Sequence, residues 1–407
     1  MWIKRDIFDF IQSAQGFYIQ IIIGPRQSGK SSLCIILGKD EFKEINFDDL
    51  QTRTLAQTDP ALFLSLNPPP LVLDEVQYVP NLFSQLKLLV DLEKKKKILT
   101  PSSMKIEPSP HQVRYRLTGS NLILLSKNVS ETLVGRAQYF YLNTLSVSEI
   151  VHSFPTVTLS EILFKGGLPE IWTNPALKVT SYLNDYIMSY IQKDVAQSAG
   201  IEKLSEFDKV LRLLSGRVGQ LINFSEVARD SGVKSVTVKE WTSVLNKSQL
   251  VYLLLPFETN LSNRLIKSPK LYFWDSGLAV RLQGWSEISP MCISPMIGGL
   301  FENLVLGEII KFKNNYGQDW PLYFWRTREG EEIDFILQTA PNEWLAFDAK
   351  WSQNPSPEIL PTNFKKYFPH VDKIILITPE GEEKMLSKQC LQLPIKKLSD
   401  FLKKFSL

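Results

Sequence analysis

Short apolar runs bounded by polar residues recur along the first 150 residues of the chain. Such runs are typical of buried strands when turn residues flank them and the run is too short for a helix. They predict strands over 18–23, 70–73, 115–118 and 139–142. A helical pattern over 122–133 separates the last two strands. This alternation favours an α/β fold for the N-terminal part of the chain.

The pattern becomes mainly helical after about residue 150. Residues 151–205 contain a Gly-Gly-Leu-Pro break at 166–169 and a helical pattern at 182–195, so we expect a helical lid and connector there. Residues 206–265 then carry helices, a tight glycine turn, a further helix and a strand, at 208–214, 224–228, 231–233, 235–246 and 250–254. This order resembles a winged helix-turn-helix.

The last part of the chain, residues 266–407, again mixes helix and strand patterns. A helix is predicted over 300–312, and a turn that begins at Gly330 precedes strands over 335–337 and 344–347. We therefore expect a second α/β domain. The complete expectation is an N-terminal domain over 1–150, a lid and connector, a winged helix and this C-terminal domain.

Composition agrees with several globular domains. The 407 residues contain 44% apolar and 22% charged residues, which is ordinary for a soluble protein. No apolar run is long enough to cross a membrane and no signal peptide is apparent, so no membrane partner is expected. Cys34, Cys292 and Cys390 are widely spaced, which favours a reducing compartment and predicts a cytoplasmic protein.

The first apolar run leads directly into a phosphate-binding P-loop. Its glycines let backbone N–H groups face a triphosphate, Lys30 would reach the β and γ phosphates, and the Ser31 hydroxyl would bind magnesium. The sequence therefore predicts ATP and Mg²⁺ as cofactors. The nucleotide-binding residues we expect are Gly24, Pro25, Arg26, Gln27, Ser28, Gly29, Lys30, Ser31 and Ser32.

Polar side chains follow the next two predicted strands. Asp74 and Glu75 end the strand over 70–73, so Asp74 is predicted to hold Mg²⁺ and Glu75 to orient the attacking water. The strand over 115–118 runs into Gly119-Ser120-Asn121. Asn121 or Ser120 is a candidate sensor of the γ-phosphate, and a plain turn is the alternative.

Gly135-Arg136 follows the predicted helix and precedes the strand over 139–142. The order of P-loop, Asp-Glu, polar sensor, helix, Gly-Arg and strand resembles the AAA+ ATPases. In that family an arginine at such a position reaches the nucleotide of a neighbouring subunit. The resemblance makes Arg136 a candidate arginine finger and implies a homo-oligomer, for which a hexamer is one possibility. A surface arginine in a loop is the alternative.

Charged residues in the C-terminal domain form a further pattern. Glu302 lies in the predicted helix, Asp334 opens a strand after the Gly330 turn, and Asp348-Ala349-Lys350 ends the next strand. This order resembles the restriction-endonuclease-like core, in which carboxylates hold a divalent metal and the lysine steadies the attacking hydroxide. The resemblance marks Glu302, Asp334, Asp348 and Lys350 as a possible nuclease-like site. Asp348 stands where that pattern more often has glutamate, which puts cleavage in doubt.

Two groups of lysines are candidate contacts to DNA. A net charge of +3 does not by itself indicate a nucleic-acid partner. Lys94, Lys95, Lys96 and Lys97 precede a Pro- and Ser-rich stretch, which suggests an exposed basic loop. Lys234, Lys239 and Lys247 would face a groove or phosphates from the winged helix. The alternative for Lys94 to Lys97 is a run of solvated lysines. The alternative for the winged helix is contact with a protein.

Over nearly its whole length the chain resembles the prokaryotic AAA+ family ATPases that carry a C-terminal domain of unknown function. The resemblance rests on the P-loop, Leu73-Asp74-Glu75, Thr118-Gly119-Ser120, Gly135-Arg136, Gly166-Gly167-Leu168-Pro169 and the Gly330 to Asp334 hairpin that leads to Asp348-Ala349-Lys350. The ATP site and its arginine candidate, joined to two modules of nucleic-acid type, predict an ATPase that binds and remodels DNA as an oligomer. The alternatives are an ATP-dependent switch acting on a protein partner and an ATP-gated, metal-dependent nuclease.

Overall fold

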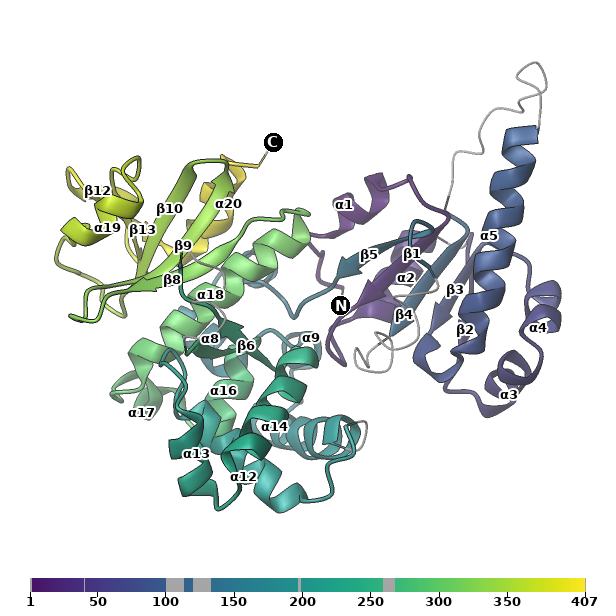
Figure 1. The fold of residues 1–407 in the computed structure, drawn as a ribbon, viewed down its shortest axis with the longest axis horizontal. Coiled ribbons are helices and arrows are strands. Elements are labelled where there is room, and N and C mark those ends of the chain that lie inside the picture. Colours follow the sequence, from purple (N-terminus) through teal and green to yellow (C-terminus); the bar gives the residue numbers. More distant parts are fainter. Residues whose placement is uncertain are drawn as a thin grey trace. The chain divides into compact units, whose positions relative to one another are not determined.

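The computed structural model describes residues 2–39, 41–99, 113–119, 133–196, 199–258 and 268–406, without the side chains of 97–99 and 192–194. The chain forms two compact units (Figure 1). The first is Asp6–Asn143, and the second combines Met1–Arg5 with Thr144–Leu407. The first unit thus ends before residue 150, and the three domains expected after that residue lie in one compact unit.

A five-stranded parallel sheet forms the centre of the first unit, with the order β2-β3-β4-β1-β5. The strands are β1 (Ile19–Ile23), β2 (Lys43–Asn46), β3 (Leu71–Asp74), β4 (Tyr115–Gly119) and β5 (Ala137–Tyr141). Every residue of β1, β3 and β4 is buried, in agreement with the apolar runs that predicted them. The helix predicted over 122–133 falls outside the described residues except at Leu133.

Helices cover both faces of this sheet. Successive side chains of a strand point to opposite faces, and Ile21 and Ile22 of β1 accordingly belong to different apolar clusters. The Ile22 cluster includes residues of α1 (Phe8–Ser13) and α2 (Lys30–Gly38). The Ile21 cluster includes residues of α3 (Leu50–Thr58), α4 (Pro60–Leu66), η1 (Val76–Tyr78) and α5 (Asn81–Leu99). Because all five strands are parallel, their carboxyl ends lie at one edge of the sheet.

The second unit begins with a helical region. Its elements are α7 (Val147–Ser153), α8 (Leu159–Lys165), α9 (Pro169–Thr173), α10 (Val179–Tyr186), the π-helix η3 (Ile187–Val195), α12 (Leu204–Ser215), α13 (Phe224–Ser231) and α14 (Ser235–Lys247). An antiparallel ribbon of β6 (Val251–Leu254) and β7 (Lys270–Phe273) follows α14. Three helices and a ribbon are compatible with a winged helix, and that assignment, like the lid, stays a prediction.

A six-stranded mixed sheet completes the second unit, with the order β12-β13-β11-β10-β9-β8. The strands are β8 (Leu322–Arg326), β9 (Glu332–Ala340), β10 (Glu343–Ala349), β11 (Ile374–Thr378), β12 (Lys384–Ser387) and β13 (Cys390–Pro394). The helical elements of this region are α16 (Ser276–Leu282), α17 (Ile288–Cys292), α18 (Ile297–Asn315), α19 (Thr362–Tyr367), η4 (Ile395–Lys397) and α20 (Leu398–Lys403). An α/β C-terminal region was predicted, and its mixed sheet agrees with that prediction.

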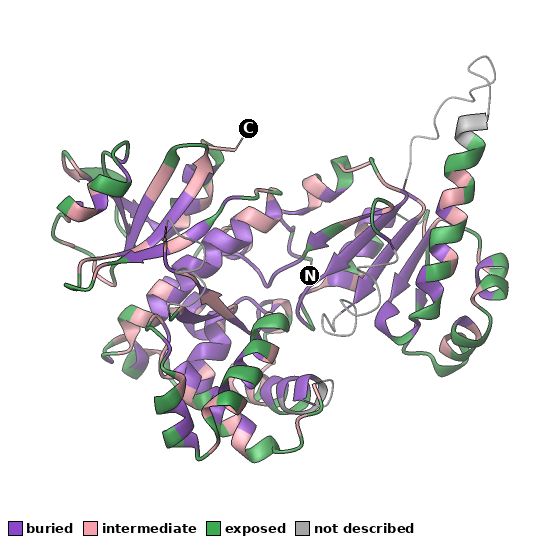
Figure 2. Ribbon diagram, viewed as in Figure 1, coloured by how far each residue is buried: buried purple, intermediate pink, exposed green. Residues whose placement is uncertain are grey.

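One apolar cluster joins the parts of the second unit, from Ile3 to Leu402. The helix α18 is buried along most of its length and contributes to this cluster (Figure 2). Arg5 is also buried, and its Nε donates to Glu149 Oε1 at 3.1 Å. The segment Met1–Arg5 thus belongs to the second unit, to which it is held by the apolar contacts of Ile3 and the ion pair of Arg5. Among the described residues, no helix is both long enough and apolar enough to span a bilayer.

The Gly-Gly-Leu-Pro motif has a structural role in this unit. The N–H of Gly167 donates to Asp275 Oδ2 at 2.8 Å. A Cβ at Gly167 would overlap the Leu145 carbonyl oxygen, and a Cβ at Gly166 would overlap the Asp275 carboxylate. Gly166 also has a φ of 71°, which favours glycine. The motif thus lets three segments of backbone pack closely.

Candidate functional site

The P-loop connects β1 to α2 in a turn that needs its glycines. A Cβ at Gly24 would overlap the carbonyl oxygen of Leu142, so a side chain does not fit there. Gly29 has a φ of 92° and immediately precedes Lys30, the first residue of α2. The loop therefore leads into the N-terminus of a helix, where free N–H groups and the helix dipole favour bound phosphate.

Lys30 lies inside this loop. Its Nζ donates to the carbonyl oxygen of Pro25 at 2.8 Å. Burial lowers the pKa of Lys30 to about 8, although the nearby Glu75 and Asp74 act in the opposite direction. The lysine is thus held against the loop backbone, in the place where the motif predicts a phosphate-binding cation.

Ser31 and Asp74 are brought together from different elements. The Ser31 hydroxyl donates to Asp74 Oδ2 at 2.8 Å. Mg²⁺ prefers oxygen ligands and uses one or two carboxylates together with water and substrate phosphates. A hydroxyl and a carboxylate at this distance fit that pattern, so these two residues could hold Mg²⁺ with a nucleotide. The pairing agrees with the prediction for Ser31 and Asp74, whose metal-binding role stays a prediction.

Neighbouring strands position the two acidic residues. The Thr118 hydroxyl of β4 donates to Asp74, and Asn46 Nδ2 of β2 donates to the same carboxylate at 3.4 Å. Glu75 follows with a φ of 57°, which turns the chain at the end of β3. The Gln77 side-chain amide donates to the Glu75 carboxylate.

Sequence reasoning missed the contributions of Asn46, Thr118 and Gln77. Thr118 was recognised as part of a strand and of the motif Thr118-Gly119-Ser120, without a role for its hydroxyl. Its position at the carboxyl end of a buried strand was the available signal. Asn46 had no such signal, because Lys43-Glu44-Ile45-Asn46 lacks the apolar run typical of a buried strand.

Arg136 forms an ion pair within its own unit. Its Nε and Nη2 donate to the two oxygens of Asp91 at 2.7 and 2.9 Å, and its Nη1 donates to the Val134 carbonyl at 2.9 Å. The guanidinium is thus bound at three points in this structure. Ser120 and Asn121, the candidate sensors, lie outside the described residues.

The prediction of a basic loop at Lys94 to Lys97 is wrong for the lysines themselves. These residues belong to α5, which continues to Leu99. Lys94, Lys95 and Lys96 are exposed, and Lys94 Nζ donates to the Gly135 carbonyl at 2.9 Å. The side chain of Lys97 and the Pro- and Ser-rich stretch after residue 99 lie outside the described residues. In the second unit, Lys234, Lys239 and Lys247 are exposed at the start, middle and end of α14.

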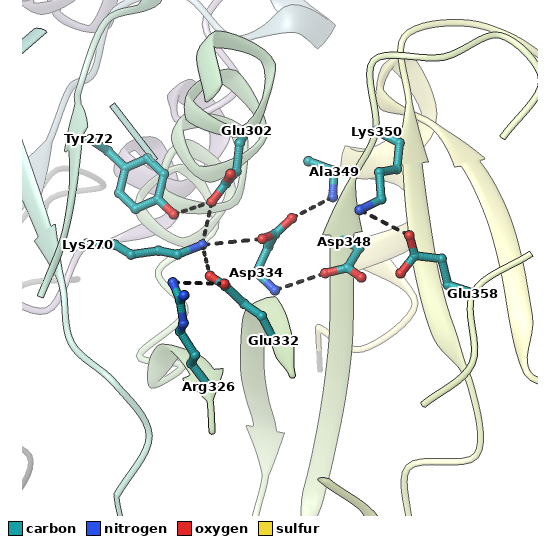
Figure 3. A network of polar contacts seen from close by, with 10 residues as sticks. All are labelled: Lys270, Tyr272, Glu302, Arg326, Glu332, Asp334, Asp348, Ala349, Lys350 and Glu358. Atoms are coloured by element: carbon teal, nitrogen blue, oxygen red, sulfur yellow. Dashed lines mark hydrogen bonds and ion pairs between the residues drawn. The ribbon is translucent and has the colours of Figure 1, made fainter. Parts of the chain in front are cut away.

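The C-terminal carboxylates meet around a lysine that the sequence analysis did not select (Figure 3). Lys270 Nζ of β7 lies 2.8 Å from Glu302 Oε1, 2.6 Å from Glu332 Oε1 and 3.3 Å from Asp334 Oδ1. The Tyr272 hydroxyl donates to Glu302 Oε1 at 2.5 Å. Burial and the neighbouring Asp334 raise the pKa of Glu302 to about 7.

Asp348 and Lys350 lie on the other side of Asp334. Asp348 Oδ1 accepts the Asp334 N–H at 2.9 Å, and Asp334 Oδ2 accepts the Ala349 N–H at 3.0 Å. Burial and Asp334 raise the pKa of Asp348 well above its usual range. Lys350 pairs with Glu358 at 3.0 Å (Figure 3).

These residues do not fit a divalent metal. The carboxylates of Glu302 and Asp334 already contact the Lys270 ammonium. Within the ranges that the structure describes, no group of three or more His, Cys, Asp and Glu side chains is arranged to hold a metal ion. The four predicted residues are therefore close together, but two of them, Glu302 and Asp334, contact the ammonium of Lys270.

Comparison with known families divides the chain into three matched segments. Residues 16–151 match a family described as an AAA domain. The N-terminal unit is therefore similar to an AAA-type P-loop domain. Residues 156–289 and 297–398 match two families described as domains of unknown function, DUF8612 and DUF4143. The AAA match supports nucleotide binding and ATPase activity by the first unit, and DUF4143 agrees with the expected C-terminal domain of unknown function.

Relatives are found in several organisms. The chain is 28% identical over 340 residues to uncharacterized proteins of Mycobacterium tuberculosis and Mycobacterium bovis, covering 83% of this chain and 71% of theirs. An uncharacterized protein of Haemophilus influenzae is 25% identical over 238 residues, covering 55% of this chain and 56% of its own. Among solved structures, a Walker-type ATPase of Pyrococcus abyssi is 12% identical with a TM-score of 0.44, covering 69% and 96% of the two chains.

Proposed function

We propose that the chain is an ATP-hydrolysing AAA-type protein that acts on DNA as an oligomer. The observation that carries ATP hydrolysis is the 2.8 Å contact between Ser31 and Asp74, beside Lys30 and Glu75. It brings a hydroxyl, two carboxylates and an ammonium to one edge of a parallel sheet. Ligands bind at the carboxyl ends of strands in such sheets.

Each residue would have a distinct role in hydrolysis. The N–H groups after Gly29 and the Lys30 ammonium would bind the phosphates. Ser31 and Asp74 would hold Mg²⁺, which supplies charge neutralisation when bound. Glu75 would orient the attacking water and accept its proton, while the Gln77 amide fixes the Glu75 carboxylate.

Assembly into an oligomer would add Arg136 from a neighbouring subunit, as in the resemblance to AAA+ proteins. For this role Arg136 would have to exchange Asp91 for a phosphate oxygen, because both Asp91 oxygens now accept from it. A competing carboxylate of this kind would keep turnover low until a partner arrives. That pairing favours the second candidate, an ATP-dependent switch that responds to a protein partner.

DNA binding is supported by the exposed lysines of α14 and by Lys94 to Lys96 of α5. Exposed lysines on one helix can neutralise phosphates, with affinity that falls as salt rises. Remodelling of DNA would follow if hydrolysis moves the second unit. No cleavage step is proposed for the nuclease alternative, because two of its carboxylates, Glu302 and Asp334, contact the ammonium of Lys270.

Measurement of ATP hydrolysis with single-stranded, duplex and branched DNA tests the proposal. We expect magnesium-dependent hydrolysis that one form of DNA stimulates and that Lys30→Ala abolishes. Hydrolysis that no DNA form changes, with no DNA binding at low salt, would reject the DNA partner and favour the switch. Absence of hydrolysis under all these conditions would reject the ATPase proposal itself.

A further inference from the structure

Lys270 is buried among carboxylates, although lysine is almost never buried without partners. Its exposed fraction is 2%, and its ammonium contacts Glu302, Glu332 and Asp334. Burial alone would lower the pKa of Lys270, but Glu302, Asp334 and Glu332 together raise it above its ordinary value. The ammonium therefore stays charged in a place where a carboxylate cluster would otherwise repel itself.

The number of contacts matches the chemistry of lysine. An ammonium has three N–H donors and no acceptor. Glu302, Asp334 and Glu332 provide one oxygen each within 3.3 Å. The ammonium donates hydrogen bonds to Glu302 and Asp334, and it forms an ion pair with Glu332.

The carboxylates also have donors of their own. Tyr272 donates to Glu302, the Ala349 N–H donates to Asp334, and Arg326 Nη1 lies 3.3 Å from Glu332 Oε2. A divalent ion would have to displace the ammonium to bind these oxygens. Displacement would leave a buried lysine charge without its partners, which is strongly unfavourable.

The loop after α12 covers this cluster. A Cβ at Gly219 would lie 3.1 Å from Glu302 Oε2, and Gly219 has a φ of 77°. Leu221 forms a β-bridge with Lys270, and a Cβ at Gly299 would lie 2.8 Å from the Val218 carbonyl oxygen. Backbone therefore lies directly against the Glu302 carboxylate.

We propose that the Lys270 ammonium is the permanent cation of this centre and takes the place that a divalent metal has in a nuclease. The centre then joins the β6–β7 ribbon to α18 and to the C-terminal sheet, and it does not cleave nucleic acid. The proposal goes beyond ATP hydrolysis and does not depend on it. Its basis is the geometry around Lys270.

Binding of Mn²⁺ to the nucleotide-free full chain tests this proposal by electron paramagnetic resonance. A Ser31→Ala background removes the hydroxyl ligand of the ATP site. In that background we expect no Mn²⁺ site that depends on Glu302. Lys270→Ala should create one Mn²⁺ site, and adding Asp334→Asn should weaken that site at least tenfold. Lys350→Ala is the matched control and should create none.

Three results would overturn the proposal. One is Mn²⁺ binding by the background chain that Glu302→Gln abolishes, and this arm does not need a Lys270 variant to fold. Another is a folded Lys270→Ala chain that gains no Mn²⁺ site. Metal-dependent DNA cleavage that Asp334→Asn removes would also contradict it. None of these results bears on ATP hydrolysis, which is measured separately.

Discussion

The Ser31 hydroxyl of α2 donates to the Asp74 carboxylate at the end of β3, at a distance of 2.8 Å. The two residues are 43 positions apart in the chain and meet because β1 and β3 end at the same edge of a parallel sheet. Their contact defines where the nucleotide and its magnesium would bind.

Asp74→Asn should lower ATP turnover by about 100-fold, because an amide cannot replace a charged magnesium ligand at a site that stabilises phosphoryl transfer. Steady-state hydrolysis with saturating Mg²⁺ measures this effect. Asn46→Ala is the matched control, since Asn46 contacts the same carboxylate at 3.4 Å but is not a proposed ligand. Equal losses in both variants would mean that Asp74 acts only through packing.

ATP binding should take up a proton above pH 8. The pKa of Lys30 is lowered to about 8 in the free chain by burial. Phosphate charge raises the pKa of a nearby lysine, so a lysine that is neutral at pH 9 becomes charged on binding. Calorimetry in buffers of different ionisation enthalpy should detect uptake of up to one proton at pH 9 and much less at pH 7. Lys30→Arg, which stays charged, should show none.

Asp91→Asn should raise ATP turnover of the assembled protein by about threefold or more, because it releases Arg136 to act on a neighbouring nucleotide. Arg136→Ala should lower turnover instead. Mixing Arg136→Ala subunits with Lys30→Ala subunits distinguishes action between subunits from action within one. The arginine-finger assignment would be contradicted if no mixture restored hydrolysis and Asp91→Asn had no effect on turnover.

Simultaneous replacement of Lys234, Lys239 and Lys247 by alanine should weaken DNA binding at all sequences alike. Three lost phosphate contacts would reduce the slope of log K against log salt by about 2 to 3. Fluorescence anisotropy over a range of salt concentrations measures both quantities. Replacement of the exposed Lys373, Lys384 and Lys388 removes the same charge elsewhere and serves as the control. Equal losses in the two triple variants would indicate only a general charge effect.

Arg5→Met should destabilise the second unit by about 3 kcal/mol, because it leaves the buried Glu149 carboxylate without its guanidinium. The side chains of this pair are only 2% and 0% exposed. Urea unfolding followed by tryptophan fluorescence measures the change. Lys403→Ala breaks an exposed pair with Asp400 and should cost less than about 1 kcal/mol. A similar small cost for Arg5→Met would show that Glu149 finds another partner.

The sequence predicted the elements whose signals are local. Apolar runs identified β1, β3 and β4, which are buried along their whole length. The strand β5 was also predicted, although only two of its residues, Ala137 and Phe140, are buried. The P-loop was found because its glycines and lysine have fixed spacing. The strand β2 was missed because Ile45 is its one buried residue.

Long-range charge pairing could not be predicted in the same way. Lys270 opens a short strand like any solvated lysine, and its partners lie 32 and 64 positions away in the chain. The Lys94 to Lys97 run suggested a loop, yet it continues a helix that begins at Asn81. Lysine is a good helix former, so a charge run does not end a helix by itself.

The burial of Ile3 and Arg5 in the second unit means that the ATPase unit is inserted into it, with covalent connections after Arg5 and after Asn143. The ATPase unit is therefore connected to the second unit at both of its ends and not by a single linker. Any change in the distance between Asp6 and Asn143 during the nucleotide cycle would exert force on the second unit at both covalent connections. A chain cut to begin at Thr144 would lose Met1–Arg5 together with the ATPase unit and leave Glu149 without its arginine.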